Sequence, residues 1–477
     1  MKYAASLFLI FLLCGFAVAP ATRPEFTPYT DAKPILDLLT EILPADLRDA
    51  APESREKVWN EWAIKRDRAI RERLAQGDAD SVINFLMFGT SFTKEARLTA
   101  ADVRQLTQDL SRNAEPAEGS PTRALLQRRE SDFLKGLKAP RGNERLDFAR
   151  RTIEGAGIQL SGPESASKTK SYLEANVRRV LQEQAGYEEA MAEAKRLNNA
   201  TEEFAEVSKL FKDRGLSLDT SLPPNFAIEE TLQEMKETGQ LKSHSLRRIG
   251  VIGPGLDFTD KHEGFDFYPV QTVQPFAVVD SVRRLGLSGQ QGVEVDVLDL
   301  SPRVLRHVNR LVAEARRGKP YTIQLPMDPK HEWQPRLVQY WREFGKQLGE
   351  GSTGASVPPA LKGVAMRGVA IRPEFALSMK AYDIDVVLQR VAFESDSQRF
   401  DLLIATNILV YYDTFEQSLA MANIAAMLRP GGFLLTNNLI LELPGAKLRS
   451  RGHTAVPYSA ADAPSRGDTI VRYMRVE

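Results

Sequence analysis

The spacing of apolar residues between positions 400 and 435 changes twice, and each change marks a new element. Residues 401–405 (Asp-Leu-Leu-Ile-Ala) are almost wholly apolar, which is typical of a strand buried on both faces of a parallel sheet. Between positions 419 and 428 the apolar residues recur at helical spacing, and the Pro-Gly-Gly sequence at 430–432 ends the predicted helix. Residues 433–435 then begin a second buried strand. The pattern predicts a strand–helix–strand unit with a right-handed crossover in a mostly parallel sheet.

Two earlier strands are predicted to end in groups suited to a nucleotide. Residues 248–252 form a short strand that runs into Gly253 and Gly255, where a Rossmann-like fold places its glycine turn. Glycines there let the backbone approach a ligand closely, although two glycines after a strand are also a common tight turn. Residues 293–299 form an alternating strand that ends in Asp299. A carboxylate at this tip can accept both ribose hydroxyls, and the alternative is that Asp299 only starts the next helix.

The sequence of residues 400–435 resembles the fourth and fifth strands of class I S-adenosylmethionine-dependent methyltransferases. It is most similar to the chemotaxis-receptor type, in which an Asn, an Ile or Leu and a Tyr-aromatic-Asp sequence follow the fourth strand. The resemblance covers about the last half of the chain, residues 246–477. It implies an α/β Rossmann-like methyltransferase domain with a mostly parallel seven-stranded sheet. An antiparallel C-terminal pair, expected at residues 454–458 and 469–476, completes that sheet.

The resemblance also implies S-adenosylmethionine as the cofactor, bound at the ends of three strands by Gly253, Pro254, Gly255, Asp257, Asp299, Thr406 and Asn407. The family pattern after the first strand is acid-x-Gly-x-Gly-x-Gly. This chain departs from it, because Val251 replaces the acid and Asp257 replaces the third glycine. Asn407 and Tyr411 are the candidates on the side of the methyl acceptor. No general base is identified, and no metal site is predicted.

An unusually long loop separates the glycine turn from the following helix, which is expected at residues 276–285. We treat residues 258–275 as an insertion. Its polar groups lie beside aromatic residues, a mixture that suits a polar small ligand, and the substrate candidates are Asp266, Tyr268, Gln271 and Gln274. The alternative is a surface loop held by its own aromatic residues. His262 is a weak candidate for a general base, and an exposed histidine without a catalytic role is the favoured interpretation.

A second insertion is predicted at residues 318–360. Its aromatic residues recur at helical spacing and favour packing on the domain over a substrate lid. The third strand of the sheet has two candidates, residues 364–371 and residues 385–388. Asp383 and Asp385 could reach an adenine amino group or could end a turn. Arg367 and Arg372 are candidate anchors for an acidic substrate.

The first half of the chain is predicted to be an all-α domain without recognisable chemistry. We divide it into a helical region at residues 22–160 and long helices with a connector at 161–245. Residues 54–75 suit an amphipathic surface helix, and Asp80 could cap a separate buried helix at 82–88. Helical packing, or an interaction surface for a protein partner, is the expected role.

The composition excludes some classes of function and indicates where the protein is located. Lys plus Arg and Asp plus Glu both number 63, so the net charge is zero and nothing indicates nucleic acid binding. Cys14 is the sole cysteine and lies in an N-terminal apolar run, which excludes a disulfide framework or a cysteine nucleophile in the mature domain. Residues 1–21 have the form of a secretory signal peptide. We expect export to the periplasm or beyond, or anchoring to a membrane if the segment is retained, and no other membrane span.

The expected function is methyl transfer from S-adenosylmethionine to a small-molecule or peptide-like acceptor. The signal peptide conflicts with this expectation, because the cofactor is made in the cytosol. The alternative is therefore an exported, non-catalytic binding or scaffold protein on a degenerate methyltransferase fold. A third hypothesis is an enzyme that uses a different nucleotide-like ligand in the same cleft.

Overall fold

The structure is a computed structural model that describes residues 23–111, 120–194, 211, 214–216, 220, 222–259, 265–330, 332–459 and 467–477. The predicted signal peptide and His262 lie outside these residues. Among the described helices, none has the length and apolar character needed to cross a membrane.

The last half of the chain is built on a seven-stranded sheet, as the sequence predicted. Its strands, in spatial order, are β11 (Leu448–Pro457), β12 (Gly467–Arg475), β10 (Leu428–Thr436), β9 (Phe400–Ala405), β2 (Arg248–Ile252), β3 (Glu294–Asp299) and β7 (Lys380–Asp383). The pairs from β10 to β7 are parallel, whereas β12 is antiparallel to both β10 and β11. This is the methyltransferase-like arrangement with an antiparallel C-terminal pair, so the predicted fold class is confirmed.

Alternate residues of the central strands supply two separate cores, which explains why these strands read as continuous apolar runs. Val251 lies opposite Val297 and Ile404, and all three belong to one core. Ile252, with its neighbours on adjacent strands, belongs to the other. The first core is covered by α9 (Pro223–Glu237), α10 (Gln274–Arg284) and α11 (Pro302–Ala315). The second is covered by α14 (Thr414–Met427) together with helices from the first half of the chain.

The second insertion forms a small sheet of its own. Its strands β4 (Tyr321–Met327), β6 (Ala365–Ile371) and β5 (Gly349–Ser352) are antiparallel, and α12 (Pro335–Glu343) packs its predicted aromatic residues into the first core. Both candidates for the third strand of the main sheet were therefore wrong. Residues 364–371 fall on β6, and residues 385–388 follow β7. The true edge strand β7 buries only Tyr382, so it lacks an apolar run.

The helical half contains α1 (Tyr29–Leu38), α2 (Ala45–Arg48), α3 (Arg55–Phe88), α4 (Ala100–Ser111), α5 (Pro121–Lys138), α6 (Glu144–Gly155) and α7 (Ser165–Ala194). The predicted break before residue 82 is wrong, because α3 continues through Asp80 without interruption. Gly77 lies inside this helix because the backbone packs closely there. A Cβ atom at Gly77 would lie 2.0 Å from the carbonyl oxygen of Leu216.

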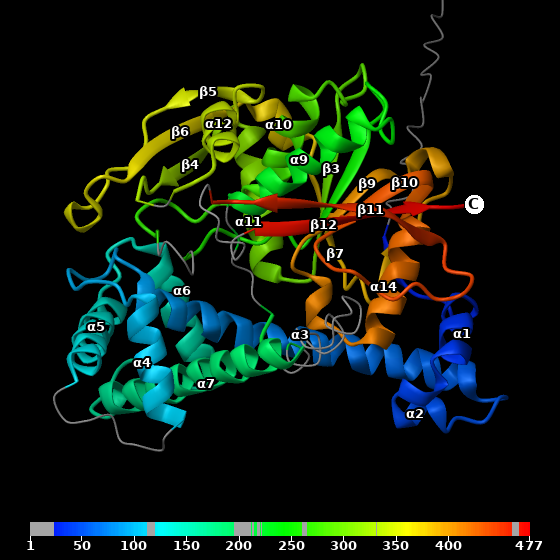
Figure 1. The fold of residues 1–477 in the computed structure, drawn as a ribbon. Coiled ribbons are helices and arrows are strands. Elements are labelled where there is room, and N and C mark those ends of the chain that lie inside the picture. Colours follow the sequence, from blue (N-terminus) through cyan, green and yellow to red (C-terminus); the bar gives the residue numbers. More distant parts are fainter. Residues whose placement is uncertain are drawn as a thin grey trace, which may run out of the picture.

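The helical half is joined to the α/β half along much of its length. Figure 1 shows α3 running beneath the α/β half, from α4–α7 on one side to α1 and α2 on the other. The short strand β1 (Pro24–Phe26) pairs with β8 (Gln389–Val391). Trp59 of α3 is fully buried, and its indole N–H donates to the carbonyl of Thr27 at 2.9 Å. The second core contains residues of α1 and α3 together with residues of β9 and α14, so the two halves share this core.

Candidate active site

The predicted cofactor residues lie together along the edge of the sheet that is formed by the carboxyl ends of its central strands. The glycine turn follows β2, Asp299 ends β3, and Thr406 follows β9. β2 lies between β3 and β9, so its end is the point at which the strand order reverses. In doubly wound folds, ligands bind outside the carboxyl ends of the strands at such a point.

The turn after β2 requires its glycines. Gly253 and Gly255 have φ angles of +61° and +66°, in the left-handed region that other residues rarely adopt. A Cβ atom at Gly253 would also lie 2.2 Å from the Cδ1 atom of Ile408, which follows β9. The Gly253 N–H donates a hydrogen bond to the carbonyl of Leu298 at 2.8 Å, so it is not available to bind a ligand. Conformation and space therefore both exclude a side chain here.

Asp299 is a buried carboxyl group with one unused oxygen. Its side chain is 5% exposed, and Oδ1 accepts a hydrogen bond from the Ser301 backbone at 2.7 Å. Oδ2 is buried and has no hydrogen-bond partner among the described residues. Burial raises the pKa of Asp299 to about 7, although the Ser301 hydrogen bond opposes the rise. A ribose hydroxyl is the type of donor that would satisfy Oδ2.

Asp257 binds the first insertion instead of leaving space at the position of the third glycine. Its Oδ2 accepts hydrogen bonds from the Tyr268 hydroxyl at 3.0 Å and from Nε2 of Gln271 at 2.8 Å. Nε2 of Gln271 also donates to the Gln324 carbonyl, and Oε1 accepts from the Gln324 backbone, both at 2.8 Å. Two predicted substrate residues, Tyr268 and Gln271, thus hold the loop to the glycine turn and to β4.

Asp266, a third predicted substrate residue, is held by the helical half. Its carboxylate accepts from the Thr90 backbone and Ser91 backbone, both at 2.8 Å, and from the Thr90 hydroxyl at 2.7 Å. These two residues follow the C-terminal end of α3. Asp266 is 2% exposed and both of its carboxylate oxygens accept hydrogen bonds from these fixed donors, so it is not open to a ligand.

A buried arginine of α6 also holds the first insertion in place. The Arg145 guanidinium is 2% exposed and donates to the backbone carbonyls of Phe258 and Tyr268 at 2.5 Å and of Asp257 at 3.4 Å. The neighbouring Glu144 accepts from the Val270 backbone at 2.5 Å. Sequence reasoning missed these contacts, since α6 lies more than a hundred positions before the loop.

Gln274 and Thr406 are a further pair of predicted residues that bind each other directly. Nε2 of Gln274 donates to the Thr406 hydroxyl at 2.9 Å, and this joins the start of α10 to the end of β9. Asn407 follows in the left-handed region, with a φ angle of +58°, and its side chain is exposed. Its backbone N–H donates to Oδ1 of Asn437 at the end of β10, at 2.8 Å. A strained polar residue here is consistent with a role at the site.

A carboxyl group that the sequence did not single out lies beside these residues. Asp468, at the start of β12, accepts hydrogen bonds from the Tyr458 hydroxyl and from Asn437. Burial raises the pKa of Asp468 above its usual range, and the two hydrogen bonds oppose the rise. The sequence placed Asp468 in a loop between two strands, and it offered no signal that β10 and β12 would bring it to Asn437.

Helix α3 forms one wall of this edge, which the sequence also did not indicate. Arg71 donates to the Leu300 carbonyl after β3 at 3.3 Å and to Asp383 of β7 at 2.6 Å. Arg73 donates to the carbonyl of Tyr411 at 3.1 Å. The Tyr411 ring packs edge-on against Phe211, with their centroids 5.5 Å apart. Tyr411 therefore contacts this wall, whereas the other acceptor-side candidate, Asn407, is on the β10 side.

The remaining candidates are a buried aspartate and two arginines that contact other parts of the protein. Asp385 is fully buried with Oδ2 unpartnered among the described residues, and burial raises its pKa to about 7. Arg367 donates to the carbonyls of Trp341 and Phe344, so it holds α12 in place. Arg372 is an exposed partner of Glu374. Within the described ranges, no group of three His, Cys, Asp or Glu side chains could hold a metal ion.

Comparison with known proteins finds similarity in structure alone. No family model matches the sequence, and no curated protein resembles it. The similar solved structures include the N-methyltransferase NodS from Bradyrhizobium japonicum WM9 with S-adenosyl-L-homocysteine (12% identity, 57% of this chain, 99% of that chain, TM-score 0.25). They also include the glycopeptide N-methyltransferase MtfA with S-adenosyl-L-methionine (11%, 55%, 97%, 0.26) and the S-adenosylmethionine-dependent methyltransferase SibL in its apo form (12%, 79%, 96%, 0.27).

These solved structures belong to the superfamily that the sequence resembles. Because every reported TM-score is below 0.3, the alignments themselves decide nothing about this chain. The strand order and the parallel and antiparallel pairings establish its methyltransferase-like fold.

Proposed function

We propose that this protein is a methyltransferase that uses S-adenosylmethionine and acts on a small-molecule or peptide-like acceptor. The observation that carries the proposal is the unpartnered, buried Oδ2 atom of Asp299, at the same sheet edge as the Gly253–Gly255 turn. An unsatisfied buried oxygen destabilises a folded protein unless a ligand supplies a donor. The nucleoside part of the cofactor has hydroxyl groups of the required kind.

The chain's own residues would bind and orient the reactants. Gly253 and Gly255 allow the backbone to approach the cofactor, and Asp299 would accept hydrogen bonds from the ribose. When bound, the cofactor supplies an electrophilic methyl group. Asn407 is exposed beside the Gln274–Thr406 pair and would contact the acceptor. Rate enhancement would come mainly from holding the acceptor in line and excluding water.

Asp468 gives the proposed site a group that could take up a proton. It is linked to Asn407 through Asn437, and burial raises its pKa, so its carboxylate holds a proton more readily than an exposed aspartate does. An amine acceptor loses a proton when it gains a methyl group, whereas a carboxylate acceptor loses none. Asp468 therefore favours an acceptor whose nucleophilic atom carries a hydrogen.

The competing proposal is an exported, non-catalytic binding protein on the same fold. Two observations favour it: Val251 is fully buried where the family has an acid, and Asp257 is tied to Tyr268 and Gln271 where the family has a glycine. Export itself is proposed from residues 1–21 alone. In this case the unpartnered oxygen of Asp299 would serve a different nucleotide-like ligand, or none.

Calorimetric titration with S-adenosylmethionine and S-adenosylhomocysteine separates the two proposals. We expect binding in the micromolar range that Asp299→Ala abolishes. Glu350→Gln, an exposed change on β5 in the separate three-stranded sheet, is the control and should bind as the natural sequence does. If a folded sample gives no heat with either ligand, the enzyme proposal fails and the binding-protein proposal is favoured.

A further inference from the structure

A second cavity lies at the opposite edge of the sheet from the candidate active site. It has a volume of about 460 Å³ and is bounded by α1, the outer face of α14 and the segment at residues 441–448. Arg399, directly before β9, and Arg475, at the end of β12, line its floor. None of the candidate cofactor residues takes part. The cavity is therefore separate from the proposed methyl-transfer site.

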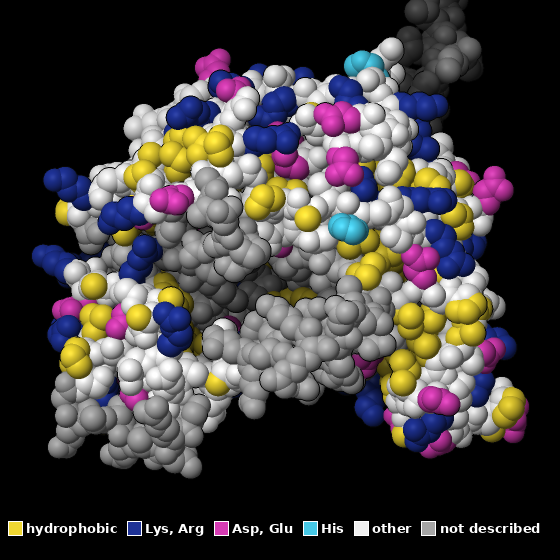
Figure 2. Space-filling model, in the orientation of Figure 1, with side chains coloured by type: hydrophobic (Ala, Val, Ile, Leu, Met, Phe, Trp, Pro, Cys, Tyr) yellow, Lys and Arg dark blue, Asp and Glu magenta, His cyan; other side chains and the backbone are white. Residues whose placement is uncertain are grey.

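One wall of the cavity is apolar and extended. The alanines at positions 422, 425 and 426 of α14 and the α1 residues Ile35 and Leu38 line this apolar part of the cavity, which we call the channel. Figure 2 shows hydrophobic side chains gathered on the right of the molecule, over the region where Figure 1 places α14 and α1. Leu38 is 47% exposed, so apolar surface remains open to solvent at the rim.

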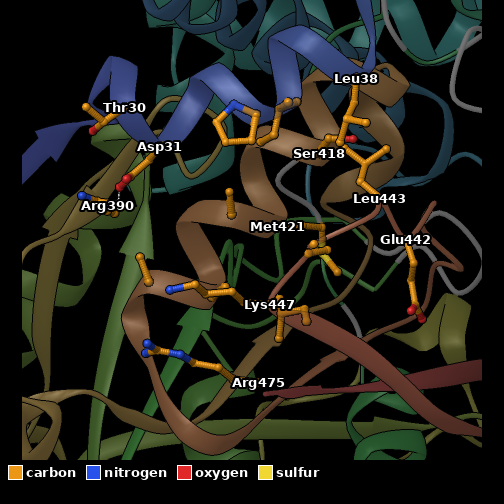
Figure 3. A pocket seen from close by; sticks show the side chains of 18 of the residues that line it. Thr30, Asp31, Leu38, Arg390, Ser418, Met421, Glu442, Leu443, Lys447 and Arg475 are labelled. Atoms are coloured by element: carbon orange, nitrogen blue, oxygen red, sulfur yellow. Dashed lines mark hydrogen bonds and ion pairs between the residues drawn. The ribbon is translucent and has the colours of Figure 1, made fainter. Parts of the chain in front are cut away.

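The opposite end of the cavity carries an excess of positive charge. Lys447 and Arg475 have no carboxylate within ion-pair distance in the part of the chain that is described, whereas Arg399 pairs with Asp396 at 3.1 Å. Arg475 is 9% exposed and donates to the Leu428 carbonyl, yet its buried Nε has no acceptor. Figure 3 shows the Lys447 and Arg475 side chains extending side by side, with Met421 above them.

The acidic residues that line the cavity pair with other basic residues and not with Lys447 or Arg475. Glu25 and Asp31 bind Arg390 at 3.1 and 2.6 Å. Glu442 binds Arg449 at 3.3 Å. The cavity thus combines an apolar channel with a cationic end that contains a buried, unsatisfied N–H donor.

We propose that this cavity binds a single-chain amphiphile with a carboxylate head, of the fatty-acid kind. The alkyl chain would lie in the channel between α14 and α1. The carboxylate would accept hydrogen bonds from Arg475 and Lys447, in the charge-assisted geometry that guanidinium groups favour. The volume lies within the range of small-ligand pockets, which favours a single alkyl chain over a two-chain phospholipid.

Titration of the full-length protein with monomeric dodecanoate tests the proposal, and it does not depend on methyltransferase activity. We expect one molecule to bind per chain. Dodecyltrimethylammonium, which has the same chain and the opposite charge, should not displace it. Acetate, which has the head group alone, should not bind measurably, because the apolar channel would contribute nothing.

Matched variants distinguish this cavity from non-specific association. Lys447→Glu should weaken dodecanoate binding by about 10-fold or more, since it replaces a charge-assisted contact by repulsion. Lys362→Glu changes the charge equally at an exposed site elsewhere and should have no effect. Leu38→Asp should weaken binding by about 10-fold as well, whereas Ile64→Asp, at a residue 53% exposed on α3, should not.

These variants change exposed side chains, so folding should be preserved, which circular dichroism checks. The proposal is overturned if dodecanoate does not bind as a monomer, or if it binds only when presented in anionic vesicles. It is also overturned if the cationic amphiphile competes equally, or if Lys447→Glu and Leu38→Asp behave like their controls.

Discussion

Asp299 is the residue at which stability and proposed function conflict. Its burial favours the neutral form, and its pKa rises from 3.8 to about 7. Between about pH 4 and pH 7 the folded chain therefore holds a proton that the unfolded chain has already lost. The contribution of Asp299 to the free energy of unfolding is fully present below its pKa in the unfolded chain. It is lost as the pH rises through its pKa in the folded chain.

Asp299→Asn should remove this pH dependence. The free energy of unfolding of the natural chain, relative to the variant, should fall by about 2–3 kcal/mol between pH 5 and pH 8. Urea unfolding of both proteins at the two pH values measures the difference. Asp383→Asn is the control, because its carboxyl group is largely exposed. A constant difference across the pH range would contradict the buried, proton-holding state of Asp299.

Ligand binding should reverse the rise in pKa. Ribose hydroxyls that donate to Asp299 would stabilise its ionised form, so binding near pH 6 should release up to about one proton. Calorimetric titration of S-adenosylhomocysteine in two buffers of different ionisation enthalpy measures the number released. The affinity should increase as the pH rises from 6 to 8. Binding without proton release would place the ligand away from Asp299.

At the scale of elements, the sequence predicted those parts of the fold that are fixed by local pattern. Short apolar runs identified β2, β9 and β10, and an alternating pattern identified β3. Parallel strands necessarily bring their carboxyl ends to one edge. The pattern failed for β7, because an edge strand that buries only Tyr382 has no apolar run. It failed again at α3, where close packing against Leu216 accommodates Gly77.

The role of the first insertion could not be read from the sequence, since its partners come from distant segments. Asp266 is held by Thr90 and Ser91, and the backbone carbonyls of Asp257, Phe258 and Tyr268 are held by Arg145. Polar residues beside aromatic ones suit either a ligand or such internal contacts. Only the tertiary structure distinguishes these two roles for each residue.

Arg145→Met should therefore release the loop at the candidate site. The change leaves three buried carbonyl groups without their donor, so we expect a loss of about 3–5 kcal/mol in the free energy of unfolding. Arg150→Met on the same helix removes only an exposed pair with Glu154 and should cost less than about 1 kcal/mol. Chemical unfolding measures both. Equal, small losses would show that Arg145 does not hold the loop.

At the scale of the whole molecule, the predicted all-α half is continuous with the α/β half in its packing. Phe258, which follows the glycine turn, packs edge-on against Phe148 of α6 at 4.8 Å and against Phe85 of α3 at 6.0 Å. Trp62 of α3 contacts Phe415 of α14, with centroids 5.5 Å apart. Separating the halves would expose these rings to water. A helical half that only bound a partner would not need to share its core in this way.

The four tryptophans allow a direct test, because two lie on α3 and two lie in the second insertion. In a chain with Trp59→Phe and Trp62→Phe, tryptophan fluorescence reports only on the α/β half. In a chain with Trp333→Phe and Trp341→Phe, it reports only on the helical half. The pairs are matched, since each contains one buried indole N–H that donates to a carbonyl, from Trp59 to Thr27 and from Trp341 to Leu325.

Shared cores predict that both reporters unfold together. In urea, the fluorescence midpoint of each variant should coincide with its own midpoint by circular dichroism, as in a single cooperative transition. If the helical half unfolded at lower urea, the second variant would lose its fluorescence signal before its overall helicity. That outcome would leave Asp266 and the backbone carbonyls of Asp257, Phe258 and Tyr268 without their buried partners while the sheet remained folded. Helix α3 contacts the proposed cofactor site at the carboxyl ends of the strands. Cooperative unfolding would therefore also mean that this site forms only when both halves of the chain are folded.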